Sequence, residues 1–450
     1  MIKSQFPDDF EKRMRGDLGT SWQAFADAHK EATPVSIRMN PRKLTLKPLG
    51  DSIPWTTTGL YLPARPSFTL DPTFHAGCYY VQEASSMFLE QAFIQFVSGE
   101  QHLNILDLSA APGGKSTHIL SLINKQSLLV SNEVIRQRAG VLAENVQKWG
   151  YDNVVVTNND PQDFQRLPGF FDVIVVDAPC SGEGLFRKDF NAMNEWSGDN
   201  VLLCSKRQRR ILSDVLPALR PGGILIYATC TYNANENEDN LEWLSKESDI
   251  TFLPLEGVEK WGIVPVSKGP VIGYRFYPHR VKGEGFFMAV MRKDGDGAEY
   301  RHRQKGSFTG PSKKIMERVR SWVNDPDEKT FIVRNEQLQF FPKGKTSEVE
   351  ALARCLYIIM AGTNLLTIKH DKLIPEHPAA LSTELNRDNF KIVDVELDEA
   401  LRYLRKETMT IQPIEKGFTL ISYLGIPLGW MNVLDTRINN LYPAEWRIRM

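Results

Sequence analysis

Short apolar runs alternate with longer segments of helical periodicity through the middle of the chain. The apolar runs are NILDL (104–108), SLLVSN (127–132), NVVVT (153–157), FDVIVVD (171–177) and GGILIYAT (222–229). Between them, as in 136–150 and 201–219, apolar residues recur at helical spacing. Buried strands that alternate with helices are typical of a parallel sheet with helices on both faces. The pattern therefore predicts an α/β fold, which closes with GEGFFMAVMRK (283–293) as a late strand.

The same pattern divides the chain into units. The predicted units are an N-terminal flank (1–95), an α/β domain (96–292), a basic linker (293–314), a small α+β module (315–372) and a C-terminal module (373–450). The flank begins with a polar helical pattern around Phe10, Met14 and Trp22. The linker is polar and contains glycine. Near the end of the chain, GFTLISYLGIPLGWMNVLD predicts a hairpin that turns at Gly425–Pro427.

The composition is that of an ordinary globular protein. Hydrophobic residues make up 42% of the 450 residues and charged residues 24%, which excludes a largely disordered or collagen-like chain. A formal net charge of −1 excludes a protein that is basic over its whole surface, although a local basic face remains open. The five cysteines are scattered and odd in number, which favours free thiols in a reducing compartment. No stretch reaches the ~18 apolar residues of a membrane span, and we expect a cytoplasmic protein without a membrane partner.

A glycine-rich loop, DLSAAPGGKS (107–116), follows the first predicted strand. In doubly wound sheets, ligands bind beyond the carboxyl ends of the strands, where glycines let the backbone approach them. The spacing in Ala110–Lys115 fits neither a P-loop nor G-x-G-x-x-G. This argues against a nucleotide-dependent ATPase and against a dinucleotide enzyme.

Carboxylates follow the first three strands. Asp107, Glu133 and Asp160 stand at successive strand ends, where an acidic side chain can hold the ribose hydroxyls of a nucleoside. Any one of them alone is more often a surface acid, because short motifs match by chance. Together they suit a nucleoside with a ribose, a base edge and a cationic appendage, which describes S-adenosylmethionine.

Two further motifs place cysteines at strand ends. DAPCSGEG (177–184) follows the fourth strand, and ATCT (228–231) ends the fifth. Such cysteines are usually inert core thiols, but Cys180 and Cys230 lie beside polar loops at the edge that carries the glycine loop. Pro179 fixes its own φ and holds Cys180 on a rigid turn. No histidine or cysteine stands at zinc-ligand spacing near either thiol, so we expect no metal site.

The three motifs together resemble the Sun-type RNA cytosine-5 methyltransferase family. DLSAAPGGKS, DAPCSGEG and ATCTYNANENE occur in the family's order and spacing, and SIRMN (36–40) with VQEASS (81–86) is similar to its N-terminal RNA-binding flank. The additional C-terminal modules resemble the bacterial RsmF-like branch, which ends in a PUA-like RNA-binding domain, here 373–450. The resemblance implies a Rossmann-like methyltransferase domain that depends on S-adenosylmethionine.

The resemblance also implies roles for particular residues. The cofactor is expected on Ser109, Ala110, Ala111, Pro112, Gly113, Gly114 and Lys115, and on Glu133, Asp160 and Asp177. Cys230 is expected to add to C6 of cytosine, which makes C5 able to accept a methyl group, and Cys180 to help release the product. Asp177 can bond the N3/N4 edge of the base, and Lys115 favours a nearby anion. The rigid Pro179–Cys180 turn alone favours exchanged roles for the two thiols, and the residues do not decide between them.

Basic residues indicate where RNA is held. Lys206, Arg207, Arg209 and Arg210 form one run between the cysteine motifs, and Arg301, Arg303, Lys305, Lys313 and Lys314 lie in or next to the linker. A charge run is usually a solvated face, but beside a catalytic edge a phosphate track is the better interpretation. Arg38 and Asn40 are expected to touch RNA or to cap a turn. The target base must leave any stack to reach a thiol.

These inferences predict a monomeric, S-adenosylmethionine-dependent RNA cytosine-C5 methyltransferase that acts on small-subunit (16S) ribosomal RNA through a covalent adduct. One alternative is a transfer-RNA methyltransferase with the same chemistry. Another is a non-catalytic RNA-binding or ribosome-assembly factor that retains the fold. The intact set of Cys180, Cys230, Asp177 and Lys115 argues against a loss of catalysis.

Overall fold

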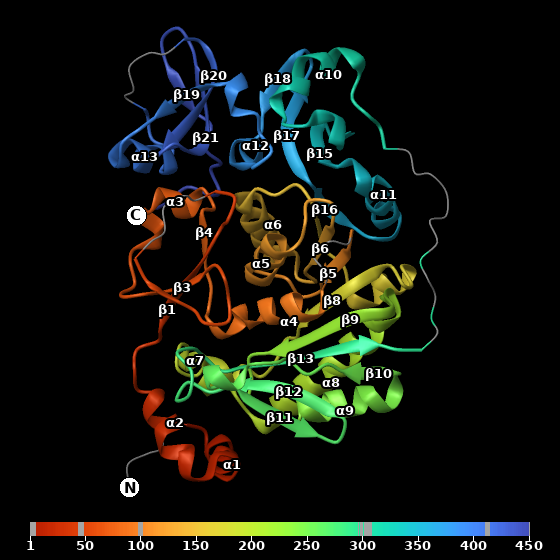
Figure 1. The fold of residues 1–450 in the computed structure, drawn as a ribbon. Coiled ribbons are helices and arrows are strands. Elements are labelled where there is room, and N and C mark those ends of the chain that lie inside the picture. Colours follow the sequence, from red (N-terminus) through yellow and green to blue (C-terminus); the bar gives the residue numbers. More distant parts are fainter. Residues whose placement is uncertain are drawn as a thin grey trace.

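A 10-stranded sheet runs through the middle of the computed structural model (Figure 1), which describes residues 6–43, 49–97, 102–295, 297, 300, 308–409 and 415–449. Its strands are β5 (Asn104–Asp107), β6 (Leu128–Asn132), β7 (Val154–Thr157), β8 (Phe171–Asp177), β9 (Leu219–Thr229), β10 (Ile250–Phe252), β11 (Val264–Lys268), β12 (Val271–Phe276), β13 (Phe286–Lys293) and β16 (Ile358–Ala361). The order β7-β6-β5-β8-β9 is parallel throughout, and β13 lies antiparallel to β9. The predicted α/β fold and its late strand are confirmed.

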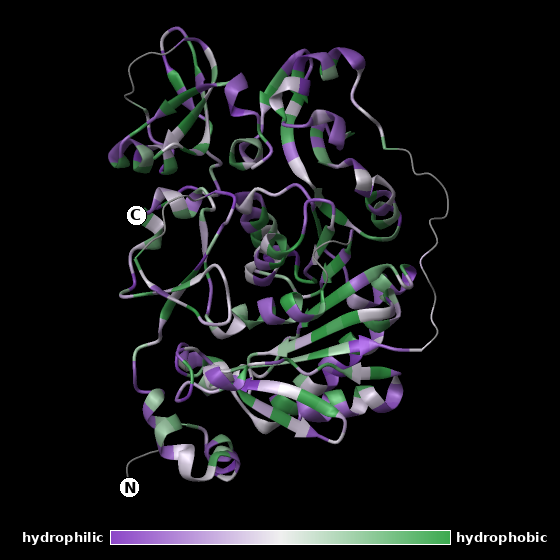
Figure 2. Ribbon diagram, viewed as in Figure 1, coloured by the Kyte–Doolittle hydropathy of each residue, from purple (hydrophilic) through white to green (hydrophobic). Residues whose placement is uncertain are grey.

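Helices cover both faces of this sheet because successive strand residues point to opposite sides. Ile105 packs into the cluster formed with α4 (Leu89–Phe96), α5 (Gly114–Leu122) and α6 (Arg136–Trp149). Leu106 packs into the cluster formed with α8 (Gly198–Val215) and α9 (Glu238–Glu247). Figure 2 shows the apolar colour along β9 and β13 between these helices.

The N-terminal flank consists of helices and a small sheet of its own. Its elements are α1 (Asp8–Leu18), α2 (Trp22–Ala28), β1 (Val35–Met39), β2 (Asp51–Ser52), β3 (Gly59–Leu62), α3 (Pro72–His75) and β4 (Tyr79–Val81). The predicted helical pattern is confirmed, since Phe10, Met14 and Trp22 are buried on α1 and α2. They share one apolar cluster with Phe186 and Tyr232, which follow the two cysteine motifs. The first helices therefore brace the loops that carry the thiols.

The C-terminal half holds two further sheets. Its elements are α10 (Lys313–Val319), β14 (Lys329–Arg334), β15 (Gln337–Pro342), α11 (Thr346–Cys355), β17 (Thr363–Lys369), β18 (Lys372–Pro375), α12 (His377–Leu381), β19 (Lys391–Asp394), α13 (Leu397–Leu404), β20 (Gly417–Tyr423), β21 (Ile426–Val433) and β22 (Ile438–Asn440). The hairpin β20–β21 is antiparallel as predicted. Its turn is centred on Leu424 and Gly425, one residue earlier than expected, with φ of +54° and +70°. Two positive φ values match the right-handed twist of the paired strands.

One strand of the C-terminal half belongs to the central sheet. β16 pairs antiparallel with β7 and places Met360 opposite Val156. Leu352 and Ile358 share a core cluster with Leu128 and other residues of the parallel strands. The segment predicted as a small α+β module (315–372) thus forms a four-stranded sheet of its own and also contributes β16 to the central sheet, where it covers an edge that would otherwise stay unpaired.

The last module also packs against the rest of the chain. Leu404 and Met431 lie in one apolar cluster with Leu60 and Tyr79 of the N-terminal flank. Figure 1 shows the C-terminal end beside α3.

Among the helices of the described residues, none has the length and apolar character that a bilayer crossing requires.

Candidate active site

The glycine-rich loop connects β5 to α5 at the carboxyl edge of the parallel strands. Gly113 has a φ of +115°, where a side chain would be strained, and a Cβ on Gly114 would lie 3.5 Å from the ring of Tyr80. Asp107 at the end of β5 accepts a bond from Ser116 Oγ at 2.6 Å, while its other oxygen is buried without a protein partner. Burial raises the pKa of Asp107 to about 7. The loop thus has a backbone conformation that favours glycine, with a buried acid behind it.

Glu133 lies beside this loop, one residue beyond β6. Its side chain is almost fully buried and accepts a bond from the Ile135 backbone N–H at 3.0 Å. Arg138 lies 3.4 Å from the carboxylate and donates to the Ala111 carbonyl at 2.9 Å. Because the Arg138 side chain is half-exposed, it can move aside for a ligand without breaking a core contact. The structure therefore brings Glu133 and the loop together, with Arg138 bridging them.

Asp160 and Arg210, which the sequence analysis assigned to separate ligands, form an ion pair with each other. Asp160 accepts a bond from the Gln162 backbone N–H at 3.1 Å, and its carboxylate is bonded to the Arg210 guanidinium. Arg210 also donates to Asp214 at 3.1 Å. The predicted cofactor and RNA contacts at these residues thus require this pair to open. An exposed pair of this kind contributes only about 0–1 kcal/mol, so a ligand can displace it.

Lys115 and Asp177 form an ion pair beside the thiols. Lys115 Nζ lies 2.7 Å from Asp177 Oδ2, and it stands 5.3 Å from the centre of the Phe286 ring. Burial alone would lower the pKa of Lys115, but Asp177, and after it the charges of Asp107 and the Cys230 sulfur, raise it above its ordinary value. The ammonium is therefore held as a positive charge beside Asp177.

The two predicted cysteines are in contact with each other. Cys180 Sγ lies 3.1 Å from Cys230 Sγ, although 50 residues separate them along the chain. The hydrogen bond to Cys230, together with burial, raises the pKa of Cys180 well above its ordinary value. Cys180 therefore keeps its proton, and either sulfur can donate the hydrogen bond that joins the two. The Gly184 backbone N–H bonds the Cys230 carbonyl at 2.8 Å, which ties one cysteine loop to the other.

A buried carboxylate that was not singled out from the sequence ties the same loops together. Glu236, fully buried, accepts bonds from the Ser181 backbone N–H and from Gln208 Nε2, both at 2.9 Å. Ser181 Oγ bonds Glu236 and lies 3.0 Å from Thr231 Oγ1. Ser181 and Thr231 are the residues after the two cysteines, so Glu236 fixes both turns. The signal was present in ATCTYNANENE, but sequence alone did not show which of its acids points inward.

Arg38 is a core residue in this structure. It is 0% exposed, donates to Gln82 Oε1 at 2.8 Å and to Thr117 Oγ1 at 2.5 Å, and stacks over the Trp149 ring at 4.5 Å. A side chain without exposed surface cannot touch RNA. The expected RNA contact is therefore corrected: Arg38 joins β1 to α5 behind the glycine loop.

Asn40 is also fully buried. Its amide donates to the carbonyls of Gly77 and Trp149 at 2.9 and 3.0 Å, and its oxygen accepts from the Arg42 backbone N–H at 3.1 Å. The predicted RNA contact is corrected here too, whereas the alternative of a turn cap is the arrangement found.

The remaining predicted RNA contacts lie on α8 and at the start of α10. Lys206 and Arg207 are exposed and form no ion pair with any described residue. Arg209 donates to Asn240 at 2.8 Å and stacks over Trp243 at 5.3 Å. Lys313 and Lys314 are exposed on α10. Arg301, Arg303 and Lys305 lie outside the described residues.

Within the described ranges, no group of three or more His, Cys, Asp or Glu side chains could hold a metal ion.

Family profiles match three parts of the chain. The profile of the 16S rRNA methyltransferase RsmB/F matches residues 94–292, that of the N-terminal domain of 16S rRNA methyltransferase RsmF matches 6–84, and that of the methyltransferase RsmF PUA domain matches 390–448. The resemblance drawn from the sequence motifs is confirmed, including its PUA-like ending.

Solved structures share the architecture. A methyltransferase homolog protein from Pyrococcus horikoshii is 28% identical with a TM-score of 0.53, over 61% of this chain and 91% of that one. The structure of NSun6 from Pyrococcus horikoshii with SFG has a TM-score of 0.54 at 20% identity, over 65% of this chain and 99% of that one. The second likeness shows the fold alone.

Relatives align along almost the whole chain. Ribosomal RNA small subunit methyltransferase F of Shewanella sp. (strain MR-4) is 30% identical over 91% of this chain and 90% of its own length. The protein of the same name from Citrobacter koseri is 30% identical over 98% of this chain and 96% of its own. The chain therefore belongs to the RsmF family of 16S rRNA methyltransferases.

Proposed function

We propose that this chain methylates C5 of a cytosine in 16S ribosomal RNA through a covalent adduct with Cys230. The observation that carries the proposal is the pair of thiols 3.1 Å apart at the sheet edge that holds the glycine loop. Cytosine C5 is a poor nucleophile until a thiolate adds at C6. A second group must then remove the C5 proton so that the enzyme can leave. Two thiols in contact supply both functions.

The surroundings of the thiols support Cys230 as the nucleophile. Lys115 is a buried cation whose pKa is raised, after the opposing effect of burial, by Asp177 and by the Cys230 sulfur. A positive charge beside a sulfur favours its thiolate. Cys180, by contrast, is held protonated by its bond to Cys230 and by burial. Because the Lys115 cation interacts with the Cys230 sulfur, and because the pKa of Cys180 is raised, Cys230 is the better attacking group.

Cys180 is suited to the later step. The largest cause of its raised pKa is the hydrogen bond to Cys230. Once the Cys230 sulfur is bonded to C6, it is a thioether that no longer holds this proton, so the pKa of Cys180 falls and Cys180 can release its proton to solvent. The resulting Cys180 thiolate takes the C5 proton, the electrons of the C5–H bond re-form the C5–C6 double bond, and the C6–S bond breaks so that Cys230 leaves as a thiolate. Asp177 lies at the same edge, where it can bond the base edge on which charge develops.

S-adenosylmethionine is the cofactor of this family, and the residues present fit it. Gly113 has a φ of +115° that a side chain would strain, and an oxygen of Asp107 at the start of the loop is buried without a protein partner. Glu133 lies beside the same loop, where ribose hydroxyls are bound in related sheets. When bound, the cofactor supplies an electrophilic methyl group. We propose the loop 109–115, Glu133, Asp160 and Asp177 as its binding residues.

Replacing Glu133 with alanine is expected to weaken S-adenosylmethionine binding. Hydrogen bonds to a charged acceptor contribute about 1.5–3 kcal/mol each, which corresponds to about 10- to 150-fold in affinity. Calorimetric titration of Glu133→Ala measures this directly. Glu144→Ala, which removes an acid that pairs with Lys148 on the neighbouring helix α6, is the control. Equal affinities in both variants would remove Glu133 from the cofactor site.

Bisulfite sequencing tests the substrate. RNA from a strain with this chain is expected to contain a 16S cytosine that resists conversion, and the same cytosine is expected to convert when the chain is deleted. Loss of protection in a transfer RNA instead would favour the alternative substrate. If no cytosine changes, while ribosome assembly is slowed, the chain is an RNA-binding assembly factor.

A further inference from the structure

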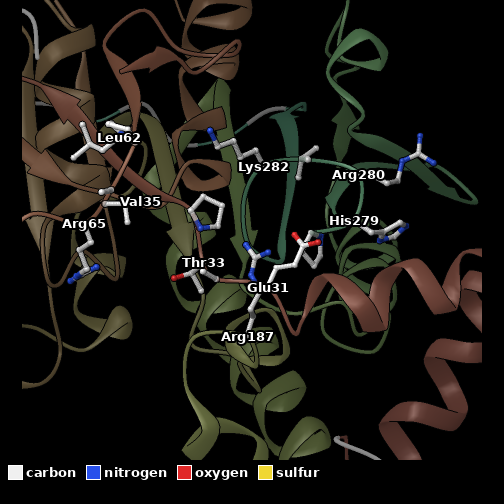
Figure 3. A pocket seen from close by; sticks show the side chains of 15 residues that line it. Glu31, Thr33, Val35, Leu62, Arg65, Arg187, His279, Arg280 and Lys282 are labelled. Atoms are coloured by element: carbon white, nitrogen blue, oxygen red, sulfur yellow. The ribbon is translucent and has the colours of Figure 1, made fainter. Parts of the chain in front are cut away.

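A basic groove separates the N-terminal flank from the loop between β12 and β13. It encloses about 790 Å³, and Figure 3 shows its lining side chains. One wall consists of residues 31–35 and 62–65, and the other of residues 278–282, with Arg187 at the base. The two walls come from segments more than two hundred residues apart, so the groove exists only in the folded chain. None of the roles assigned so far uses it.

The groove opens beside the catalytic edge. β13 is antiparallel to β9 with Phe287 opposite Thr229, so the loop before β13 lies at the same edge as Cys230. The Gly285 backbone N–H contacts the Gly184 carbonyl, and the Gly184 N–H bonds Cys230. Lys282, which lines the groove, is three residues from Gly285, a distance of at most about 11 Å along an extended chain. A polymer bound in the groove therefore passes close to the thiols.

The charges of the groove are largely free for a ligand. Arg65 and Arg280 are exposed and form no ion pair with any described residue. Lys282 lies over the Tyr61 ring at 4.5 Å, and its contact with Asp51, at 4.0 Å, is loose. Arg187 is the exception, because Glu284 neutralises it. Among the lining residues, Glu31 is the acid that opposes these cations.

We propose that this groove binds the sugar–phosphate backbone of the RNA strand next to the target cytosine. The proposal rests on the proposed function, because it assumes an RNA substrate. Arg65 and Arg280 from one wall each, with Lys282, neutralise successive phosphates. His279 is half-buried on the second wall, and an imidazole can stack on an unpaired base. Single strands are held by cationic grooves with such stacking platforms.

The groove suits a single strand. Its volume of 790 Å³ lies in the range of pockets for small ligands, ~300–1,000 Å³, which is room for part of one strand. A target base must also be turned out of its stack to reach the thiols, which leaves its neighbouring nucleotides unpaired at this edge. An acidic protein segment could also pair with the cations of the groove, but only the RNA substrate must pass beside the thiols.

Matched triple variants test the proposal. Arg65→Gln/Arg280→Gln/Lys282→Gln removes the groove cations. Arg220→Gln/Lys246→Gln/Arg292→Gln removes the same number of arginines and lysines from exposed sites away from the thiols; Arg292 pairs with Ile224 near the start of β9. Affinity for a short single-stranded RNA that contains cytosine is measured over a series of salt concentrations. S-adenosylmethionine affinity, measured for both variants, shows that each is folded.

The groove variant is expected to bind RNA at least about 10-fold more weakly at low salt, with a log–log salt slope smaller by about 2. This follows because each phosphate contact in a single strand contributes about 0.7 to that slope. The control should keep the wild-type slope. As a second measurement, 4-thiouridine in the RNA should crosslink wild-type protein within 278–282 or at Ala64 and Arg65.

An unchanged slope in the groove variant, or crosslinks only outside these segments, overturns the proposal. If polyglutamate binds wild type and loses its binding in the groove variant while RNA does not, the groove is a site for an acidic protein segment. If wild type binds S-adenosylmethionine but methylates no RNA, the proposed function itself fails. Wild type that methylates RNA while the groove variant keeps full RNA affinity overturns the groove alone.

Discussion

Cys230→Ala will form no covalent complex with RNA, whereas Cys180→Ala will accumulate one that survives denaturing electrophoresis. Without the Cys230 thiol no bond to C6 can form, and methyl transfer should fall by at least about 10⁴-fold, as is usual when a nucleophile is removed. Without Cys180 the attack and the methyl transfer still occur, but the C5 proton is not removed. The protein then stays attached to its product.

Cys355→Ala is the matched control, because Cys355 is a partly buried free cysteine on α11 that contacts Arg166 and not the thiol pair. It should retain activity and form no trapped complex. A complex that accumulates in Cys230→Ala and not in Cys180→Ala would exchange the two roles. The rigid Pro179–Cys180 turn would then have predicted the nucleophile correctly, and the family resemblance would not.

Asp177→Asn is expected to lower kcat by about 10²–10³-fold, which is typical for loss of a group that stabilises developing charge. The substitution keeps the shape of the side chain but removes the negative charge 2.7 Å from Lys115. Without this charge the largest effect that raises the pKa of Lys115 is lost, so the ammonium loses its proton at lower pH than in wild type. The alkaline limb of the pH–rate profile should therefore move to lower pH.

Asp239→Asn provides a comparison with the same chemistry, since Asp239 also pairs with a lysine, Lys268, at 2.7 Å but lies on the surface. Its kcat and pH profile should match those of wild type. A rise in KM at constant kcat in Asp177→Asn would show that Asp177 only helps to bind substrate.

The parallel sheet and the elements around it could be predicted because buried strands appear in the sequence as short apolar runs between segments of helical periodicity. Runs such as FDVIVVD are apolar at every position that faces a helix. The proximity of the three motifs could also be predicted, because each motif follows a predicted parallel strand and the carboxyl ends of parallel strands lie at one edge of the sheet. The contact between Cys180 and Cys230 is the direct result of β8 and β9 being neighbours.

Other features depend on partners that no local pattern reveals. In the sequence Arg38 is indistinguishable from a surface cation, and only the fold shows that it is buried against the Trp149 ring and Thr117. Asp160 and Arg210 are each plausible ligand-binding residues, and only the fold shows that they neutralise each other. Glu236 lies in a run of polar residues whose inward and outward positions follow from the turn, not from periodicity. Charge placement is therefore the least predictable part of the site.

The pairing of β16 with β7 couples the completion of the catalytic sheet to the progress of translation. At ~5–20 residues per second, roughly ten to forty seconds pass between the synthesis of Thr157 and that of Ile358. Throughout that interval β7 is an open sheet edge, and Val155 lacks its later core neighbours. A nascent chain that already carries the glycine loop and both thiols is thus an unfinished, aggregation-prone intermediate. This edge of the catalytic sheet is therefore covered only after most of the polypeptide has been synthesised.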